Sequence, residues 1–364
     1  MYDIVIVGSG PAGANLARLI GEQYKVLLID KRELEHENPH NPANKCCGGL
    51  LAPDAQKMIA RLGLGIPKDV LVDPQLFAVR TIDLTNHLER LYQRFYFNMD
   101  RGKFDRWLVS LLPAGVDKRF SSVYKGFAEI PGGYEVRYMH QRQEISAKTK
   151  VIVGADGAFS RLRESISKGI AMPEKYISIQ EHFACSAPLS YFTAIFDEEI
   201  SDFYSWIIPK EDHLVLGSAL RPKDNTREKY DLLKTKLTQL GFHFGNKIKV
   251  EGAYIYRPKK ASQLCAGRDG IALVGEAAGA ISPSSAEGIS YALKSSLYLA
   301  ESLEEGIDGF LARYKQRMKN IRFNLLMKNL KSPVMYHPFL RQLAMKSGLE
   351  KNSYRSISRM SDRV

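Results

Sequence analysis

The sequence predicts an α/β protein with three parts: a Rossmann-type nucleotide-binding domain, a domain built on an antiparallel sheet, and a helical C-terminal appendage. Three observations lead to this fold class. A G-x-G-x-x-G segment lies between a predicted strand and a predicted helix near the N-terminus. Segments with alternating apolar and polar residues occupy the middle of the chain. Residues 312–364 combine apolar residues at helical spacing with a large excess of Lys and Arg.

The composition of the 364 residues is ordinary for a globular protein, with 45% hydrophobic and 25% charged residues. It excludes disordered, collagen-like and low-complexity proteins. No apolar run approaches the 18 residues of a transmembrane helix. Four cysteines are too few for a disulfide framework. The N-terminus lacks the basic start and long apolar core of a signal peptide, so we expect a cytoplasmic protein.

The first thirty residues have the order of elements found in dinucleotide sites. Residues 3–7 predict a buried parallel strand, residues 11–23 a helix, and residues 25–29 a second strand that ends at Asp30. The glycine segment between the first strand and the helix is Gly8-Ser9-Gly10-Pro11-Ala12-Gly13. The alternative interpretation is a glycine turn that serves packing alone.

Each residue type in this segment has a physical reason. Gly8 allows a tight turn, Gly10 lets the backbone approach a pyrophosphate, and Gly13 lets the helix pack closely against the strand. The helix begins at Pro11 and Ala12, so its free N–H groups would face the phosphates. Asp30 lies where an acid can bind a ribose hydroxyl, and we place Lys31 in the same site.

Three later segments indicate which dinucleotide is bound. They are Asn98–Leu108 with its Arg101-x-x-Phe-Asp run, Val153–Arg163 with Asp156-Gly157, and Leu273–Ile289 with Gly275-Glu276. In this order, with the N-terminal fingerprint, they resemble the FAD-dependent oxidoreductases of the para-hydroxybenzoate hydroxylase fold. That fold carries a Rossmann domain of the glutathione reductase type, and the resemblance implies FAD as the cofactor.

The resemblance also implies roles for the matching residues. Arg101 would contact the FAD, and Asp156 would tie the loop that joins the flavin domain to the substrate domain. Glu276 stands where the family usually has Asp, so we expect a shifted contact with the ribityl chain. A helix over 287–303 would direct its partly positive N-terminus at the flavin ring and stabilise the anionic reduced form. The remaining residues expected at the cofactor in this loop are Gly275, Pro283, Glu287, Gly288 and Ile289.

A narrower resemblance is carried by two further motifs. Lys45-Cys46-Cys47-Gly48-Gly49-Leu50 and Tyr204-Ser205-Trp206-Ile207-Ile208-Pro209-Lys210 are similar to the C-G-G and Y-x-W-x-x-P-K motifs of the geranylgeranyl reductase family. Ser282–Leu293 matches the flavin loop of that family. Within the family, nearly the whole chain resembles the small bacterial CbrA-type flavoproteins.

This resemblance implies a substrate pocket beside the flavin. Cys47, Gly48 and Gly49 would lie at the cofactor, with the Cys47 thiol donating a proton or shaping the pocket. Tyr204 and Trp206 would form the aromatic wall of an apolar pocket. Ordinary packing is the alternative for these three side chains. His182 is more typical of a structural histidine than of a cavity residue, and no metal-ligand spacing occurs.

The motifs divide the chain into a discontinuous FAD-binding domain and a substrate domain. Residues 1–75, 99–165 and 266–305 are expected to bind FAD, and residues 76–98 and 166–265 to form an antiparallel sheet over it. The alternation over 134–138 and 213–217 favours this sheet. Residues 306–364 form the basic helical region. The sequence has no second G-x-G-x-x-G, so the reductant would be NAD(P)H visiting the flavin directly or an electron-donor protein.

The net charge of +12 lies almost entirely in residues 312–364, which contain thirteen Lys and Arg against two Asp and Glu. The first interpretation is a helical subdomain with a solvated basic face. The second is a peripheral membrane surface at the inner face of the membrane. No recognition motif for nucleic acid is present, so we expect no nucleic-acid partner.

The leading functional hypothesis is an FAD-dependent reductase that delivers hydride from the reduced flavin to a carbon–carbon double bond of an apolar, isoprenoid-like substrate. The alternative is a monooxygenase that acts through a flavin hydroperoxide on an aromatic or apolar small molecule, because one fold supports both reactions. A halogenase is disfavoured because Tyr204 replaces the first Trp of the halogenase motif. A third hypothesis is a flavoprotein that binds a partner or senses redox state without turnover.

Overall fold

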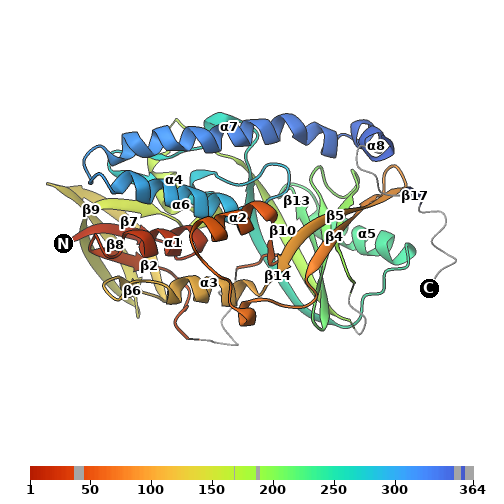
Figure 1. Ribbon diagram of the computed structural model, residues 1–364, viewed down its shortest axis with the longest axis horizontal. Helices are drawn as coiled ribbons and strands as arrows, with labels where there is room; N and C mark the ends of the chain where they lie inside the picture. The colour runs from red at the N-terminus through yellow and green to blue at the C-terminus, as the bar shows by residue number, and fades with distance from the viewer. Residues whose placement is uncertain (37–44, 168, 186–188, 348–353, 357–364) are drawn as a thin grey trace.

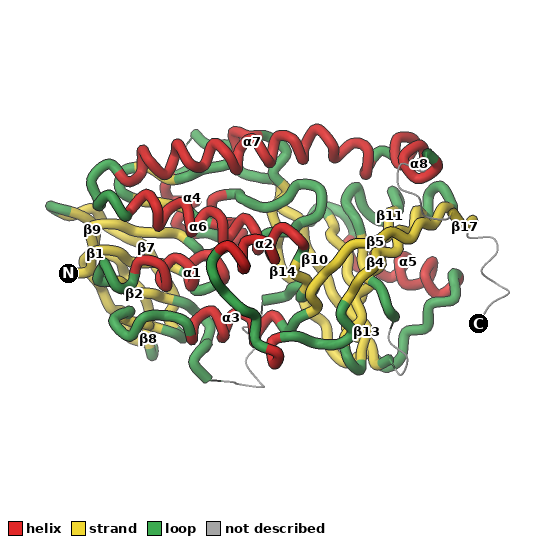
Figure 2. The backbone as a smooth tube through the Cα atoms, viewed as in Figure 1, coloured by secondary structure: helices red, strands yellow, loops and turns green. Residues whose placement is uncertain are grey.

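The computed structural model describes residues 1–36, 45–167, 169–185, 189–347 and 354–356. Two sheets occupy the two halves of the molecule, and one long helix, α7, runs along an edge past both (Figure 1). Figure 2 shows α1, α3, α4 and α6 packed around the first sheet and α5 and α8 beside the second. The predicted α/β fold with a sheet-rich second half and a helical C-terminal region is confirmed.

The first sheet has the order β15-β16-β9-β1-β2-β6, and β1 is parallel to both β2 and β9. Ile4, Val5 and Ile6 of β1 are completely buried, as expected for a central parallel strand. A β7–β8 hairpin extends the sheet through β9. The alternation over 134–138 therefore belongs to β8 in this sheet, and its assignment to the second sheet was wrong. The strands are β1 (Tyr2–Val7), β2 (Val26–Ile29), β6 (Asp117–Arg119), β7 (Ser122–Ile130), β8 (Gly133–His140), β9 (Gln143–Gly154), β15 (Gly267–Arg268) and β16 (Ile271–Leu273).

The helices of this half differ slightly from their predicted bounds. The first ends at Ile20, ahead of Gly21, and the helix expected from Glu287 begins at Ile289, because Glu287 caps it instead of entering it. The helical elements are α1 (Pro11–Ile20), α2 (Pro53–Arg61), α3 (Arg101–Ser110), α4 (Arg161–Ile166), α6 (Ile289–Leu303), η1 (Lys68–Val70), η2 (Gly157–Phe159), η3 (Ala261–Gln263) and η4 (Gly275–Ala278).

The second sheet has the order β14-β10-β13-β12-β11-β4-β5-β17, with β3 paired to β5. This is the predicted antiparallel sheet, with one parallel pair, β4 and β11. Helix α5 (Thr226–Gln239) packs on one face through Tyr230, Leu233 and Leu237. The strands are β3 (Leu50–Leu51), β4 (Leu76–Asp83), β5 (Leu88–Asn98), β10 (Glu174–Ala184), β11 (Phe192–Phe196), β12 (Ser205–Lys210), β13 (His213–Leu220) and β14 (Lys247–Arg257).

The C-terminal region consists of α7 (Phe310–Tyr336), α8 (Pro338–Lys346) and a short strand, β17 (Tyr354–Ser356), which pairs with β5. Helix α7 packs along α6, and its buried Tyr314 hydroxyl donates a 2.8 Å hydrogen bond to the carbonyl of Leu273 in the first sheet. Among the described residues, no helix is both long enough and apolar enough to cross a bilayer.

Candidate active site

A cavity of about 1190 Å³ is lined by residues from both sheets and from α7. Pockets for drug-sized ligands measure roughly 300–1,000 Å³, so this one has room for a large ligand with a second molecule beside it. Most of the predicted site residues lie in its wall. Those that line it are Gly8, Gly10, Pro11, Ala12, Asp30, Lys31, Cys47, Gly48, Gly49, Arg101, Asp156, Tyr204, Trp206, Glu276, Glu287, Gly288 and Ile289. Gly13, Gly275 and Pro283 are not among the lining residues.

One end of the cavity is built from backbone. A Cβ on Gly13 would lie 1.8 Å from the carbonyl oxygen of Gly8, and one on Gly8, whose φ is +103°, would lie 2.4 Å from that of Ala155. At Gly10 a Cβ would meet no atom within 4 Å, so this position opens onto the cavity. Helix α1 begins there without a side-chain cap. Its free N–H groups face the cavity and suit the phosphates of a dinucleotide.

Asp30 lies where the sequence predicts, at the end of β2, but protein donors surround its carboxylate. Its Oδ2 accepts from the backbone N–H and the hydroxyl of Ser9 at 2.6 and 2.8 Å, and its Oδ1 accepts from the backbone N–H of Arg32 at 2.8 Å. The ribose contact of Asp30 stays a prediction. Lys31 lines the cavity with an exposed side chain.

Arg101 is held by a buried carboxylate that the sequence analysis did not single out. Asp105 accepts from Arg101 Nε at 2.8 Å and from Arg32 Nη1 at 2.6 Å. Burial would raise the pKa of Asp105, but the two guanidinium groups outweigh it and hold the pKa below its ordinary value. Asp105 thereby fixes the orientation of Arg101 at the cavity. The Phe-Asp pair of the motif around Arg101 was the signal that could have identified it.

Asp156 presents an unused acceptor to the cavity. Its Oδ2 accepts from the backbone N–H of Arg161 at 3.0 Å, whereas its buried Oδ1 has no hydrogen-bond partner among the described residues. Burial raises the pKa of Asp156 to about 6. The hydroxyl of Tyr124, also in the cavity wall, is likewise buried without a partner in the described part of the chain. Two orphaned polar atoms beside a phosphate-ready helix end fit a polyhydroxylated dinucleotide such as FAD.

Glu276 spans the wall instead of pointing freely into the cavity. Its Oε1 accepts from the backbone N–H of Tyr256 at 2.9 Å, and its Oε2 lies 3.2 Å from Lys45 Nζ. The extra methylene relative to Asp lets the carboxylate reach β14. The expected ribityl contact of Glu276 therefore stays a prediction.

Glu287 caps α6 at the cavity. Its Oε1 accepts from the backbone N–H of Ser290 at 2.7 Å, and its Oε2 accepts from the Ser290 hydroxyl at 2.5 Å. Burial raises the pKa of Glu287. Gly288 and Ile289 line the cavity at the same helix end. A protonated Glu287 would leave the partial positive charge at the N-terminus of α6 in place, whereas an ionised Glu287 would neutralise part of that charge.

A buried lysine, Lys210, holds the loop that contains Cys47 in place through hydrogen bonds. Lys210 Nζ donates to the carbonyl oxygens of Gly49 and Met99 at 3.3 and 3.0 Å and to Oδ1 of Asn98 at 2.5 Å. Burial lowers the pKa of Lys210 to about 8. Gly49 has a φ of +65°, and a Cβ there would lie 2.3 Å from the Met99 oxygen. Lys210 is the last residue of the motif that begins at Tyr204. The motif gave no sign that Lys210 holds the Cys47 loop, and only the structure shows this contact.

The other end of the cavity is built from aromatic side chains. The rings of Tyr204 and Trp206 lie 5.4 Å apart, and the Tyr204 hydroxyl donates to the carbonyl of Ser285 at 2.8 Å. With its amide oxygen turned toward them, Gln180 accepts from Trp206 Nε1 and from the backbone N–H of Gly48, both at 3.3 Å. Tyr204 and Trp206 thus wall the cavity, while their catalytic role stays a prediction.

Cys46 shares the cavity wall with its neighbour Cys47, whereas His182 does not line the cavity. Cys46 is buried, and burial raises the pKa of its thiol to about 12, so it stays protonated. His182 lies 3.3 Å from Glu251 and is not among the cavity-lining residues. The described residues contain no group of three or more His, Cys, Asp and Glu that could hold a metal ion.

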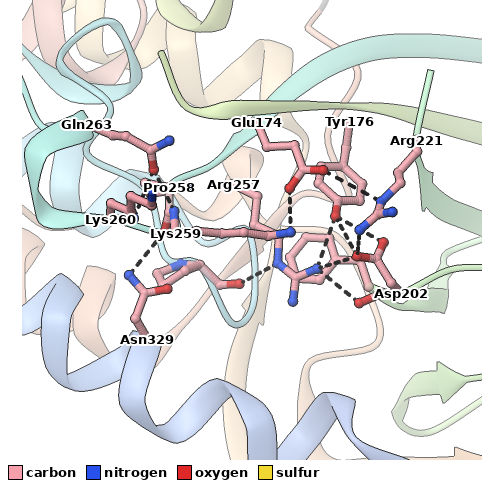
Figure 3. Close-up of polar contacts among 12 residues, drawn as sticks. Glu174, Tyr176, Asp202, Arg221, Arg257, Pro258, Lys259, Lys260, Gln263 and Asn329 are labelled. Atoms are coloured by element: carbon pink, nitrogen blue, oxygen red, sulfur yellow. Dashed lines mark hydrogen bonds and ion pairs between the residues drawn. The ribbon is translucent and has the colours of Figure 1, made fainter. Parts of the chain in front are cut away.

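Arg257 joins the pieces of chain around the cavity (Figure 3). It is buried, and it donates to the Pro283 carbonyl at 3.2 Å and to the Tyr176 hydroxyl at 3.2 Å. Its guanidinium carbon lies 4.5 Å from the centre of the Tyr336 ring of α7. The loop before α6, the second sheet and α7 are therefore fixed to one another through this side chain.

The chain is similar to CbrA proteins of Escherichia coli. It is 37% identical over 348 residues to CbrA of strain CFT073, a match that covers 96% of this chain and 94% of the relative. It is 36% identical to CbrA of strain K12, covering 96% of this chain and 97% of the relative. No protein-family model matches the sequence.

The fold is similar to several solved structures. A geranylgeranyl bacteriochlorophyll reductase-like protein from Thermoplasma acidophilum aligns over 100% of this chain and 92% of its own, with a TM-score of 0.79 and 19% identity. PqsL of Pseudomonas aeruginosa, in a complex with 2-aminobenzoylacetate, aligns over 94% and 99% with a TM-score of 0.70 and 16% identity. The flavin-dependent brominase Bmp2 aligns over 95% and 92% with a TM-score of 0.65 and 19% identity. At these identities the likenesses establish the fold.

Proposed function

We propose, from the premise that the chain belongs to the CbrA family and has the fold of FAD-dependent oxidoreductases, that it is an FAD-dependent reductase. Its substrate would be an apolar, isoprenoid-like molecule, in which it saturates a carbon–carbon double bond. The observation that carries the proposal is the two-ended cavity. A backbone cradle suited to a dinucleotide continues into an aromatic, apolar wall that contains a thiol.

The residues of the nucleotide end would bind the cofactor. The N-terminus of α1 would hold the pyrophosphate, Arg101 would contact the cofactor from the cavity wall, and Asp156 Oδ1 would accept from a cofactor hydroxyl. Bound FAD supplies two-electron hydride chemistry to such a site. The electron donor would be NAD(P)H or a redox protein.

The residues of the aromatic end would position the alkene and the proton. Tyr204 and Trp206 would hold the double bond over the reactive face and exclude water. The Cys47 thiol would hold the proton that completes the saturated product, because it lines the cavity beside the glycine pair fixed by Lys210. Hydride and proton together add two electrons and two hydrogens across the double bond.

Strictly anaerobic reoxidation tests this proposal without knowledge of the natural donor. The protein-bound flavin is reduced photochemically, a polyprenyl lipid extract is added, and the oxidised flavin spectrum is followed. A matched extract that has been hydrogenated beforehand serves as the control, because it lacks the double bonds. We expect the oxidised spectrum to return with the native extract only, together with saturated lipid in the mass spectrum.

Oxygen dependence separates the reductase from the monooxygenase. Reoxidation that occurs only after air is admitted, with hydroxylated products, would refute the reductase and favour the monooxygenase. Reoxidation by neither the lipid extract nor oxygen, with flavin still bound, would favour a flavoprotein without turnover.

A further inference from the structure

We infer that the C-terminal half of α7, together with α8, is a docking surface for an anionic lipid bilayer. The inference goes beyond the proposed reaction and does not depend on it. It rests on a second apolar stripe on α7, on the charges that flank this stripe, and on the contacts that fix the helix with the stripe outward. The surface consists of Phe323, Leu326, Met327, Leu330, Val334, Phe339, Leu340 and Leu343.

Helix α7 carries two apolar stripes on opposite sides. Phe310, Tyr314, Met318, Ile321 and Leu325 are buried in the first core. A helix turns 100° per residue, so the positions 323, 327, 330 and 334 fall on the face about 180° away. Here the side chains are exposed, with 65% of Phe323 and 65% of Leu330 accessible to solvent. The outward stripe extends about 16 Å along the helix axis.

Helix α8 continues the exposed apolar surface beyond the end of α7. Phe339 and Leu343 are 59% and 50% exposed, although they belong to a short helix with a buried side. Soluble surfaces carry scattered apolar residues, but a continuous series of this kind on two consecutive helices marks an interaction site.

The charges that α7 and α8 themselves carry are all of one sign, and acids of other elements pair with some of them, as Asp54 does with Lys328. Residues 310–346 contain nine Lys and Arg and no Asp or Glu. Five of these cations, Lys315, Lys319, Arg322, Lys331 and Lys346, have no hydrogen-bond or ion-pair partner in the part of the chain that the structure describes. An outward apolar stripe between unpaired cations is the pattern of a helix that lies in the interface of an anionic bilayer.

The anchors of the two helices keep this surface outward. Asn329 Nδ2 donates to the Pro258 carbonyl at 3.1 Å (Figure 3). The Tyr336 ring packs on the Arg257 guanidinium. On α8, the buried Arg341 donates to both carboxylate oxygens of Asp83 at 2.6 and 3.0 Å. Turning the stripe inward would require breaking these buried contacts.

A bilayer fits this surface better than a second copy of the chain does. Self-association across a two-fold axis would bring the same cations of both copies together without any acid of this region to compensate them. Anionic headgroups supply that compensation, and the acyl boundary accepts the apolar side chains. Lys328, Lys331 and Met335 of α7 also line the cavity, on a different side of the helix from the stripe, so docking the protein on a bilayer would hold the cavity about one helix width from the lipid.

Vesicle flotation of the full chain tests the inference. Vesicles of phosphatidylcholine are compared with vesicles that also contain phosphatidylglycerol. We expect at least about 25-fold stronger binding to the anionic vesicles, the gain from two engaged cations at roughly five-fold each, and weaker binding at high salt. Equal binding to both vesicle types, or none to either, would overturn the inference.

Matched variants separate the stripe from general surface effects. Phe323→Asp with Leu330→Asp should weaken flotation at least about ten-fold. Ile248→Asp with Val250→Asp changes two comparably exposed apolar residues of β14 and should leave flotation unchanged. Lys319→Gln with Arg322→Gln should weaken flotation, whereas Lys125→Gln with Lys148→Gln, on the first sheet, should not.

The second copy is tested by sedimentation velocity without lipid. A dimer that Phe323→Asp with Leu330→Asp dissociates, combined with no flotation of the unmodified chain, would assign the stripe to self-association and refute the bilayer. Circular dichroism and flavin content confirm that each variant is folded.

Discussion

The two ends of the cavity are built in opposite ways. The nucleotide end is made of backbone, with glycines at which a Cβ would lie only 1.8 and 2.4 Å from a carbonyl oxygen, and with a helix that begins without a side-chain cap. The aromatic end is made of side chains such as Tyr204 and Trp206, positioned by Gln180 and Ser285 from distant segments. The glycines of the nucleotide end leave no space for a larger side chain. At the aromatic end, single side chains can be replaced one at a time.

This difference suits the two tasks. A cofactor that never changes needs an invariant cradle, and backbone geometry provides one. A substrate pocket has to match a particular shape, which side chains determine. Substitutions at the nucleotide end should therefore cost flavin and stability together, and substitutions at the aromatic end should cost turnover alone.

The largest effect is expected at the nucleotide end. Gly13→Ala would place a methyl group 1.8 Å from the Gly8 carbonyl, so α1 must move away from β1. We expect a loss of about 3 kcal/mol in unfolding free energy and no retained flavin. Thermal melting and the flavin-to-protein absorbance ratio measure both. Gly65→Ala, where a Cβ meets no atom within 4 Å, is the control. Normal flavin content in Gly13→Ala would contradict the close packing.

The next effect tests the aromatic end under the proposed function. Cys47→Ala should keep its flavin but lose turnover about 100-fold, because the proton donor is gone. The control is Cys265→Ala, which removes a buried thiol that does not line the cavity and should change turnover only slightly. Steady-state rates with a polyprenyl substrate measure the difference. Unchanged turnover in Cys47→Ala would reduce this thiol to a packing role.

A third prediction concerns Asp156, at the nucleotide end, whose effect on stability should depend on pH. Burial raises its pKa to about 6 in the folded protein, so its ionisation is disfavoured there. The contribution of the Asp156 carboxyl group to the free energy of unfolding is complete below its pKa of about 4 in the unfolded chain. This contribution is lost as the pH rises through 6. Asp156→Asn should therefore gain about 2 kcal/mol over the flavin-free parent between pH 4 and pH 7.

Urea unfolding of the flavin-free protein at several pH values measures this gain. The exposed Asp69→Asn serves as the reference and should show no such trend. If the flavin donates a hydrogen bond to Asp156 Oδ1, bound flavin should abolish most of the difference in unfolding free energy between Asp156→Asn and the parent. If the difference in unfolding free energy between Asp156→Asn and the parent does not vary with pH, burial does not disfavour the ionised carboxylate of Asp156.

The smallest effect probes the support of the aromatic wall. A Cβ at Gly217 would lie 2.2 Å from Trp206 Cε2, so Gly217→Ala should displace the indole and leave the nucleotide end intact. We expect about a ten-fold loss in kcat/KM and unchanged flavin content. Gly115→Ala, outside the cavity lining, places its Cβ an ordinary 3.7 Å from the Gly21 carbonyl oxygen and should leave kcat/KM unchanged. Loss of flavin in Gly217→Ala would show that the two ends are not independent.

The first half of the site could be predicted because its information is local. Gly8 and Gly10 lie in the turn between β1 and α1, and Gly13 lies in the first turn of α1. Strand and helix periodicity places all three without long-range contacts. The same reasoning gave Asp30 its place at the end of β2. It could not show that Ser9 and Arg32 occupy its carboxylate, because those bonds depend on the folded turn.

The rest depends on segments that meet only in the folded chain. Asp105 fixes Arg101 by sharing its carboxylate with Arg32, 73 residues away, and Lys210 locks a loop 161 residues away. No spacing rule connects such pairs. The alternation over 134–138 correctly indicated a strand, but alternation carries no information about which sheet that strand joins.

By itself, the sequence determined the α/β class, the nucleotide-binding turn and the basic character of the C-terminal helices, because each follows from local periodicity or composition. The tertiary structure alone decided which stripe of α7 is buried. Both stripes are apolar at helical spacing, so the sequence pattern is compatible with either one facing inward. The contacts of Tyr314 with the first sheet and of Tyr336 with Arg257 select one and leave Phe323 and Leu330 exposed.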